Sequence, residues 1–233
     1  MSELIFVRHG QASFGAESYD KLSPLGVEQV RQLARYWEAN GERFDHLYSG
    51  ELLRQRETAN ELLPLLKQEQ TSVGVLPGLN EYDGSPLIDI YLRDHHPKDD
   101  PVSLPIQDRK KFQLVFEETT SRWIRGELEP AQHDTAFEAW IDFQRRVHGV
   151  IDDLMRKHTG GSRVLVSTSG GVIALALQRV LDLPDEQAIA ANWMVNNSSV
   201  TKLRYGGGRI SLTLFNGLSH LEAPELRDMI TYR

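Results

Sequence analysis

Three features are missing from or scarce in this 233-residue sequence, and each absence excludes a class of protein. There is no cysteine, which excludes a disulfide framework, a thiolate zinc site and a cysteine nucleophile, and which is compatible with a reducing cytosol. The first apolar run is about four residues long, too short for a signal-peptide core or a membrane span. The formal net charge is -7, so a nucleic-acid-binding surface is not expected. We therefore expect a soluble, cytoplasmic protein that binds neither nucleic acid nor membranes.

The remaining composition is typical of a soluble globular protein, with 40% hydrophobic and 25% charged residues. A chain of this length can bury a sizeable core within one large domain. From about residue 85 to residue 130 the alternation of strands and helices gives way to helical patterns around a polar loop. We interpret this segment as an insertion over the sheet, because it is too short for an independent core. The prediction is a single domain, residues 1–233, with a helical cap at about 85–130.

Hydrophobic periodicity divides the chain into short strands and amphipathic helices. Strands are predicted at residues 4–7, 44–49, 71–76, 164–168, 199–205 and 209–215. Helices are predicted at residues 24–39, 51–67, 86–93, 106–125, 135–158, 170–181 and 185–191. Strands that alternate with helices indicate a mostly parallel sheet, and three glycines between the last two strands indicate an antiparallel hairpin at its edge. The predicted fold class is α/β, a three-layer α/β/α sandwich.

Charged and small residues follow several of these predicted strands. One strand ends in the stretch Arg8 to Gly10, another in Ser169 to Gly171, and the stretch Leu79 to Asp83 carries two carboxylates. Ligands of open α/β sheets bind at the carboxyl ends of the strands, so these groups are expected to meet at one edge. Arg8 and Arg54 would supply forked donors for a phosphoryl or carboxylate group, and the helix after Ser169 would add backbone amides.

Each of these groups also has an explanation that involves no function. An Arg-His-Gly tripeptide occurs by chance, and a carboxylate such as Glu81 is usually an ordinary loop residue. Arg54 on a helix is often solvated and paired with a nearby glutamate. His220 would more often cap or pack than catalyse. The order and spacing of the segments together, and no single one of them, indicate a shared site.

Taken in order, six segments resemble the histidine phosphatase superfamily, which includes cofactor-dependent phosphoglycerate mutase. These segments are Leu4–Gly10, Leu22–Gln29, Ser49–Ala59, Leu79–Glu81, Val164–Gly171 and Asn216–Leu221. They span nearly the whole chain and leave only residues 85–130 and the connecting stretches unmatched. The resemblance implies the fold class given above, with a phosphate pocket at the end of the first strand.

The resemblance also implies roles for individual residues. His9, held neutral, would attack phosphorus in line and become a phosphohistidine. Arg8 and Arg54 would neutralise the equatorial oxygens, and Glu81 would protonate the leaving oxygen and then deprotonate water. No cofactor and no metal are implied. The metal-site candidate, the pair His95–His96 among aspartates, is better explained as a solvated loop.

Two positions depart from the family pattern. The family's second histidine falls on Ser169, whose hydroxyl can donate a hydrogen bond but carries no charge. We still expect Ser169 and Gly170 to bind phosphate, although loss of one transition-state donor typically costs about 10²–10³ in rate. Phosphoglycerate-mutase-like members place an asparagine where this chain has Gly15, and Ser13 is a candidate to substitute for it in part.

These departures leave three functions open. The leading hypothesis is a metal-independent phosphatase that hydrolyses a small phosphomonoester through a phosphohistidine on His9. The alternative is a catalytically weak or inactive phosphate-binding member of the family. A phosphoglycerate mutase ranks lower because of the same two departures. His220 and His133 are candidates to replace the missing imidazole. Neither the substrate nor the oligomeric state follows from the sequence, and specificity is expected to come from residues 85–130.

Overall fold

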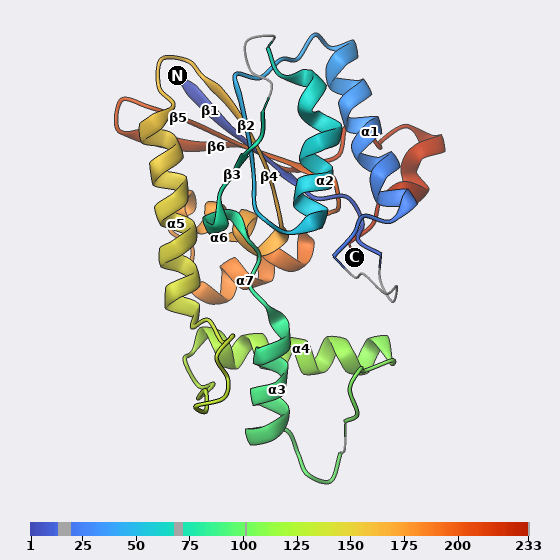
Figure 1. The fold of residues 1–233 in the computed structure, drawn as a ribbon, viewed down its shortest axis with the longest axis vertical. Helices are drawn as coiled ribbons and strands as arrows, with labels where there is room; N and C mark the ends of the chain where they lie inside the picture. The colour runs from blue at the N-terminus through green and yellow to red at the C-terminus, as the bar shows by residue number, and fades with distance from the viewer. Residues whose placement is uncertain (14–19, 68–71, 101, 233) are drawn as a thin grey trace. The chain divides into compact units, whose positions relative to one another are not determined.

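The computed structural model describes residues 1–13, 20–67, 72–100 and 102–232. The chain forms two compact units, one made of Met1–Glu81 with Val147–Arg233 and the other of Tyr82–Arg146. Figure 1 traces the course of the chain through both units. Within the described ranges, no helix is both long enough and apolar enough to cross a membrane.

A six-stranded mixed sheet is the centre of the first unit. Its strands are β1 (Ser2–Arg8), β2 (His46–Ser49), β3 (Gly74–Val75), β4 (Arg163–Thr168), β5 (Val200–Gly206) and β6 (Arg209–Gly217). They lie in the order β3-β2-β4-β1-β5-β6. The pairs β1–β4, β4–β2 and β2–β3 are parallel, whereas β5 runs antiparallel to both β1 and β6. The predicted mostly parallel sheet with an antiparallel edge is confirmed.

The position of β1 inside the sheet explains its apolar sequence. Residues Leu4 to Val7 are 0% exposed, as expected for a strand covered on both faces, where neither side meets water. Arg8 pairs in register with Thr168 at the end of β4, and Ser49 at the end of β2 pairs with Ser167. The carboxyl ends of β1, β4 and β2 therefore lie next to one another at one edge of the sheet.

Helices cover both faces of this sheet (Figure 1). The helices of the first unit are α1 (Pro24–Ala39), α2 (Leu53–Leu62), α6 (Gly170–Leu181), α7 (Asp185–Met194), the part of α5 (Trp140–Lys157) from Val147 onward, and the 3-10 helices η1 (Leu63–Leu65), η2 (Pro77–Leu79) and η3 (Pro224–Met229). Residues of α1 and α2 share an apolar cluster with Ile5 and Val7, so these two helices cover one face. The helix α6, buried from Gly170 to Gln178, packs against the other face. This arrangement is the predicted three-layer α/β/α sandwich.

Local signals explain where α1 starts and stops, and why α2 is short. The Ser23 side chain accepts a hydrogen bond from the Gly26 amide at 3.0 Å and caps α1 where the sequence predicts. Gly41, with φ of 69°, follows the C-cap in a left-handed conformation that glycine adopts without steric cost. The helix predicted at residues 51–67 forms only from Leu53 to Leu62 and continues as η1, because Pro64 has no N–H to extend the α-helical pattern.

Two other elements differ from their predicted bounds. β3 contains only two residues of the predicted 71–76, of which Thr71 lies outside the described residues. Among the described residues it is an edge strand that pairs only with β2, and Pro77 follows after one intervening residue, Leu76. α5 begins at Trp140 and not at residue 135, because the preceding residues form turns. One of these turns is closed by the hydrogen bond from the Phe137 amide to the Asp134 carbonyl (3.1 Å).

The second unit contains α3 (Gly84–Asp94), α4 (Arg109–Ile124) and the first residues of α5. Trp123 is 1% exposed and lies at the centre of an aromatic cluster. Its ring centroid is 4.7 Å from that of Tyr82, 5.0 Å from Trp140 and 5.7 Å from Phe143. The predicted insertion at 85–130 lies inside this unit, and all three partners of Trp123 come from beyond it. The role of the segment as a cap on a single domain stays a prediction.

Candidate active site

His9 is the first residue after β1, and a close contact between two glycines fixes the turn that follows it. A Cβ on Gly10 would lie 2.2 Å from the carbonyl oxygen of Gly26 in the first turn of α1, so only glycine fits at residue 10. The His9 amide donates to the Thr168 carbonyl at 2.9 Å, and the His9 carbonyl accepts from the Asn197 side-chain amide at 3.2 Å. The backbone of His9 is therefore held between β4 and the segment that leads into β5.

The imidazole of His9 is buried, and its surroundings define one tautomer. Its Nδ1 lies 2.8 Å from the carbonyl oxygen of Gly10, which can only accept, so Nδ1 carries the hydrogen and Nε2 keeps its lone pair. Nε of Arg54 donates to that Nε2 across 3.1 Å. Burial, followed by the positive charges of Arg54 and Arg8, lowers the pKa of His9 well below its ordinary value. The imidazole is therefore neutral, as a nitrogen nucleophile must be.

Arg54 lies in the first turn of α2 and is anchored by Asp20. Its Nη1 donates to one oxygen of the Asp20 carboxylate, and the other oxygen accepts from the Leu53 amide at 2.7 Å. The side chain of Arg54 is only 13% exposed, so the ion pair is partly shielded from water. Asp20 thereby ties the guanidinium to the start of α2 and holds it against His9. Asp20 was not predicted as a site residue, because nothing in a polar loop distinguishes this carboxylate from its neighbours.

Arg8 is the last residue of β1, and its side chain reaches the segment between α7 and β5. Its Nη1 donates to the carbonyl of Val195. The charge of Arg8 is close enough to His9 to lower the pKa of the imidazole. Arg8 and Arg54 therefore bring two guanidinium groups to one neutral imidazole. Forked donors of this kind suit an oxyanion with several oxygens, such as a phosphoryl group.

Glu81 lies at the N-terminus of α6. Its carboxylate accepts a hydrogen bond from the Gly171 amide at 2.9 Å, where the positive end of the helix dipole favours a negative charge. Ser169 is the N-cap residue of α6, yet its side chain makes no capping hydrogen bond. Glu81, which follows η2, supplies the cap in its place.

The hydroxyl of Ser169 is bonded to Gln55, a residue of α2 that was not among the predicted site residues. Gln55 Nε2 lies 2.9 Å from Ser169 Oγ and 3.1 Å from the carbonyl oxygen of Leu79. Gln55 is 0% exposed and Ser169 is 1% exposed, so the contact is shut off from water. The signal that could have identified Gln55 is a glutamine in the buried stripe of a helix, directly after Arg54.

His220 is linked to the end of β1 through Ser198. Its Nε2 lies 2.8 Å from Ser198 Oγ, and burial lowers the pKa of His220 to about 4. The Ser198 amide in turn donates to the carbonyls of Arg8 and His9. Among the described residues, the hydrogen bond of the His220 ring is to Ser198 and not to the His9 ring. The structure therefore places the His220 ring against Ser198, and a catalytic role for His220 stays a prediction.

Ser13 and His133 are the other candidates from the sequence. The Ser13 amide donates to the carbonyl of Lys21 at 2.8 Å. Gly15, at the position where mutase-like proteins have asparagine, lies outside the described residues. His133 belongs to the second unit, where its Nε2 lies 3.5 Å from a carboxylate oxygen of Asp134. No hydrogen bond in the described ranges joins Ser13 to the His9 ring.

The stretch Asp94–Asp100, which contains the histidine pair considered as a metal site, has two aspartates that basic neighbours pair. Arg93 binds Asp94 at 2.7 Å, and Lys111 binds Asp100 at 2.6 Å. Nε2 of His96 faces the Asp100 carbonyl at 2.6 Å. In the part of the chain that the structure describes, no group of three or more histidine, cysteine, aspartate or glutamate side chains could hold a metal ion.

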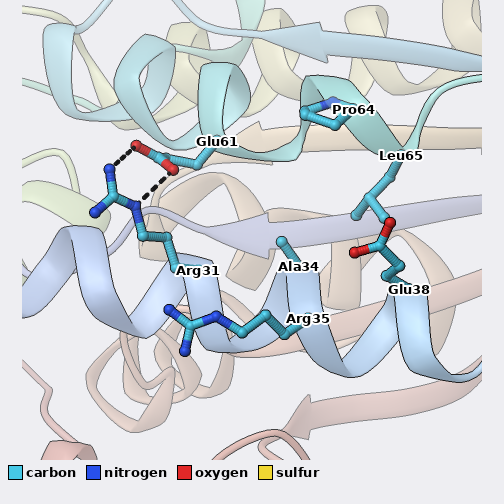
Figure 2. Close-up of a pocket in the computed structure, with 7 residues that line it drawn as sticks. All are labelled: Arg31, Ala34, Arg35, Glu38, Glu61, Pro64 and Leu65. Atoms are coloured by element: carbon cyan, nitrogen blue, oxygen red, sulfur yellow. Dashed lines mark hydrogen bonds and ion pairs between the residues drawn. The ribbon is translucent and has the colours of Figure 1, made fainter.

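A separate groove lies between α1 and the end of α2 (Figure 2). It is lined by Arg31, Ala34, Arg35, Glu38, Glu61, Pro64 and Leu65. Arg31 and Glu61 form an ion pair across it at 3.0 Å. Two arginines and two glutamates balance each other, so the groove does not concentrate charge of one sign. None of the predicted site residues lines it.

The order of these segments along the chain identifies the family. The sequence model of the histidine phosphatase superfamily (branch 1) matches residues 4–98 and 107–217. The chain belongs to this superfamily. The matched ranges contain His9, Arg54, Glu81 and Ser169, and the match confirms the resemblance seen in the motifs.

Known members resemble the chain over different lengths. A broad-specificity phosphatase of Saccharomyces cerevisiae is 31% identical over 84 residues, which are 34% of this chain and 36% of the yeast protein. The chain thus matches little more than a third of that relative's length. The Bacillus stearothermophilus protein YhfR has a TM-score of 0.66 at 20% identity, covering 95% of this chain and 100% of that one. A mutant phosphoserine phosphatase from Entamoeba histolytica, in complex with phosphoserine, has a TM-score of 0.62 at 19% identity with the same coverage of 95% and 100%. At these identities the likeness establishes the fold.

Proposed function

We propose that the chain is a phosphoric monoester hydrolase that works through a phosphohistidine on His9. The observation that carries this proposal is the neutral imidazole of His9, whose Nε2 lone pair lies against the guanidinium of Arg54. A phosphoryl group bound by Arg8 and Arg54 would accept the Arg54 Nε–H in place of Nε2, which frees the lone pair to meet the phosphorus. Membership of the superfamily and the similarity to a yeast phosphatase support the same class of reaction.

In the first step, the Nε2 lone pair of His9 forms a bond to phosphorus while the bond from phosphorus to the leaving oxygen breaks. Glu81 must enter this step as the protonated carboxylic acid, because it gives its proton to the leaving oxygen and ends the step as the carboxylate. Arg8 and Arg54 bind the equatorial oxygens and stabilise the charge spread over them in the transition state. The Nδ1–H bond to the Gly10 carbonyl stabilises the positive charge that develops on the ring.

In the second step, water attacks the phosphorus of the phosphohistidine. The Glu81 carboxylate accepts a proton from the water, and the bond between phosphorus and Nε2 breaks with its electron pair returning to His9. Inorganic phosphate leaves, Glu81 is protonated again and His9 is neutral again. Neither step uses a metal ion or an organic cofactor.

The substrate that we propose is a small phosphomonoester. The yeast relative is named for its broad specificity, and the Entamoeba structure contains phosphoserine. The arginines recognise only the phosphoryl group, so the alcohol portion of the substrate must be selected by other residues. Residues 85–130 stay the predicted source of that selection, and the cytoplasmic location also stays a prediction.

Ser169 favours a second candidate function, phosphate binding with weak or no turnover. The family's second histidine falls at this position, and a neutral hydroxyl cannot supply the charge of an imidazolium. A protein of this kind would bind phosphate through Arg8 and Arg54 and would form no phosphohistidine.

Hydrolysis of p-nitrophenyl phosphate separates the two candidates. His9→Ala is expected to abolish it. The control His148→Ala removes a half-buried histidine whose Nε2 lies 3.2 Å from the Leu175 carbonyl, and it is expected to retain activity. Calorimetry with inorganic phosphate measures the pocket independently of turnover. Phosphate binding without hydrolysis would favour the second candidate, and hydrolysis that survives His9→Ala would remove His9 as the nucleophile.

A further inference from the structure

Gln55 is buried with both amide hydrogens bonded and its amide oxygen unbonded. It lies in α2 directly after Arg54 and is 0% exposed. Its Nε2 donates to the carbonyl of Leu79 at 3.1 Å and to Ser169 Oγ at 2.9 Å. Its Oε1 meets no hydrogen-bond donor in the described part of the chain. A buried acceptor without a donor lowers stability, so the role of this side chain lies in its NH2 group.

The amide of Gln55 cannot turn over to exchange its oxygen and nitrogen. A carbonyl oxygen only accepts, so the Leu79 carbonyl requires the NH2 end of the amide to face it. Thr168 Oγ1 donates to the same carbonyl at 2.7 Å, and Ser167 Oγ donates to the backbone carbonyl of Gln55 at 2.7 Å. A Cβ on Gly50 would lie 2.0 Å from Gln55 Oε1, so the glycine leaves the space that this orientation needs. The position of the amide is therefore fixed by its neighbours.

The orientation of Gln55 determines what the Ser169 hydroxyl can do. Because Nε2 donates to Oγ, the hydroxyl is an acceptor in this bond and its own hydrogen points elsewhere. A serine at an N-cap ordinarily accepts from an amide of the first helical turn, but here the Gly171 amide is bonded to Glu81. Within the described residues, the hydroxyl hydrogen of Ser169 has no acceptor.

Ser169 and the proposed nucleophile, His9, each follow the last residue of a strand, and these two last residues are paired in register. Thr168 pairs in register with Arg8, and the Thr168 carbonyl accepts from the His9 amide at 2.9 Å. Ser169 and His9 are the residues that come directly after these two strands. A hydroxyl hydrogen that has no acceptor at this place is available to a phosphoryl oxygen, which is a strong acceptor.

We propose that Gln55 and Ser169 act together in place of the family's second histidine. Ser169 donates its hydroxyl hydrogen to a phosphoryl oxygen, and Gln55 is the positioning residue that holds the hydroxyl in the orientation for this bond. The inference rests on the proposed function, because the oxygen belongs to the phosphoryl group that His9 attacks. Arg8 and Arg54 would then supply the positive charge at the phosphoryl group. Ser169, oriented by Gln55, would supply an uncharged hydrogen-bond donor.

A double-mutant cycle tests the pair, with p-nitrophenyl phosphate for turnover and inorganic phosphate for binding. Ser169→Ala is expected to lower kcat/KM about 10²–10³-fold, mainly through kcat. Gln55→Met keeps the length of glutamine but has no donor, and it is expected to lower kcat/KM roughly tenfold. The double variant is expected to match Ser169→Ala alone. The control Gln178→Met removes a buried glutamine bonded to the Leu183 carbonyl at 3.1 Å near the end of α6, and it should leave kcat/KM unchanged.

Measuring Gln55→Met in the Ser169→Ala background distinguishes a positioning role of Gln55 from a merely structural one. If Gln55→Met lowers kcat/KM by the same factor in that background, Gln55 acts through the fold and the proposal is overturned, while the phosphatase assignment stands. Wild-type activity in Ser169→Ala also overturns it. If the wild-type chain binds inorganic phosphate without hydrolysis, the cycle is measured in phosphate affinity. The same non-additive pattern then supports the pair although the proposed hydrolysis is wrong. A chain that neither binds nor hydrolyses overturns both.

Discussion

The ends of β1 and β4 lie side by side, but they bring different chemistry to the site. β1 ends in Arg8 and His9, which supply a fixed positive charge and an imidazole. β4 leads into Ser169 and the start of α6, which supply a hydroxyl and backbone amides. Arg54 from α2 adds its charge on the side of His9. Positive charge therefore comes from one side of the site, and an oriented hydrogen-bond donor comes from the other. We expect the two sides to respond differently to substitution.

The largest contrast is expected for the charged side. Arg54→Gln removes a guanidinium from the imidazole and the phosphoryl oxygens, and it is expected to lower kcat/KM by about 10³-fold or more. The control Arg31→Gln removes an exposed arginine paired with Glu61 at 3.0 Å, and it should leave the rate unchanged. Steady-state kinetics measures both. A loss no greater than that of Ser169→Ala would erase the contrast between the two sides.

A histidine placed at position 169, where the sequence resemblance implies one, is expected to fail by itself. In Ser169→His the imidazole would collide with the Gln55 amide, which already lies 2.9 Å from Ser169 Oγ. We expect kcat/KM to fall about 10²-fold, as for loss of the hydroxyl donor. Adding Gln55→Ala removes the obstruction and should recover roughly tenfold or more of the rate. A single Ser169→His variant faster than the wild type would show that Gln55 does not occupy this space.

A smaller effect is expected from the residue that anchors Arg54. Asp20→Asn keeps the shape of the side chain but removes the charge that holds the guanidinium, so kcat/KM should fall roughly tenfold. Glu28→Gln is the control, since Glu28 pairs with the exposed Arg35 at 3.0 Å on α1. A rate in Asp20→Asn equal to that of the control would show that Arg54 is positioned without Asp20.

The acid side of the pH–rate profile sharpens the comparison further. Burial and the charges of Arg54 and Arg8 lower the pKa of His9, and attack requires the neutral ring. Activity should therefore be lost only when the pH falls below that lowered pKa. Removing the charge of Arg54 raises the pKa, so the acid limb of kcat/KM should move to higher pH in Arg54→Gln. It should stay in place in Ser169→Ala, which removes no charge, and an equal shift in both variants would contradict the assignment.

Much of the fold could be predicted because its signals are local. The apolar run of β1, the Ser23 cap and the glycine after α1 each act within a few residues of their own position. The length of β3 could not be predicted, because it depends on pairing with β2 alone at the edge of the sheet.

The site could be predicted as far as its motifs reach. The motifs read in order single out His9, Arg54 and Ser169, and their roles stay predictions. The partner of Ser169 could not be found, because Gln55 is 114 positions away in sequence and the contact exists only once α2 packs against β4. The role of Asp20 could not be predicted for the same reason, because its bond to Arg54 forms only in the tertiary fold.

The claim on which the rest depends is that His9 carries the phosphoryl group during turnover. The most direct measurement is to mix the chain with an aryl phosphate labelled in its phosphoryl group, stop the reaction in alkali, and locate the label by peptide mapping. We predict an acid-labile, alkali-stable label on the peptide that contains His9, and no label on the His9→Ala variant. Hydrolysis with the label on another residue, or at the wild-type rate in His9→Ala, would contradict the claim.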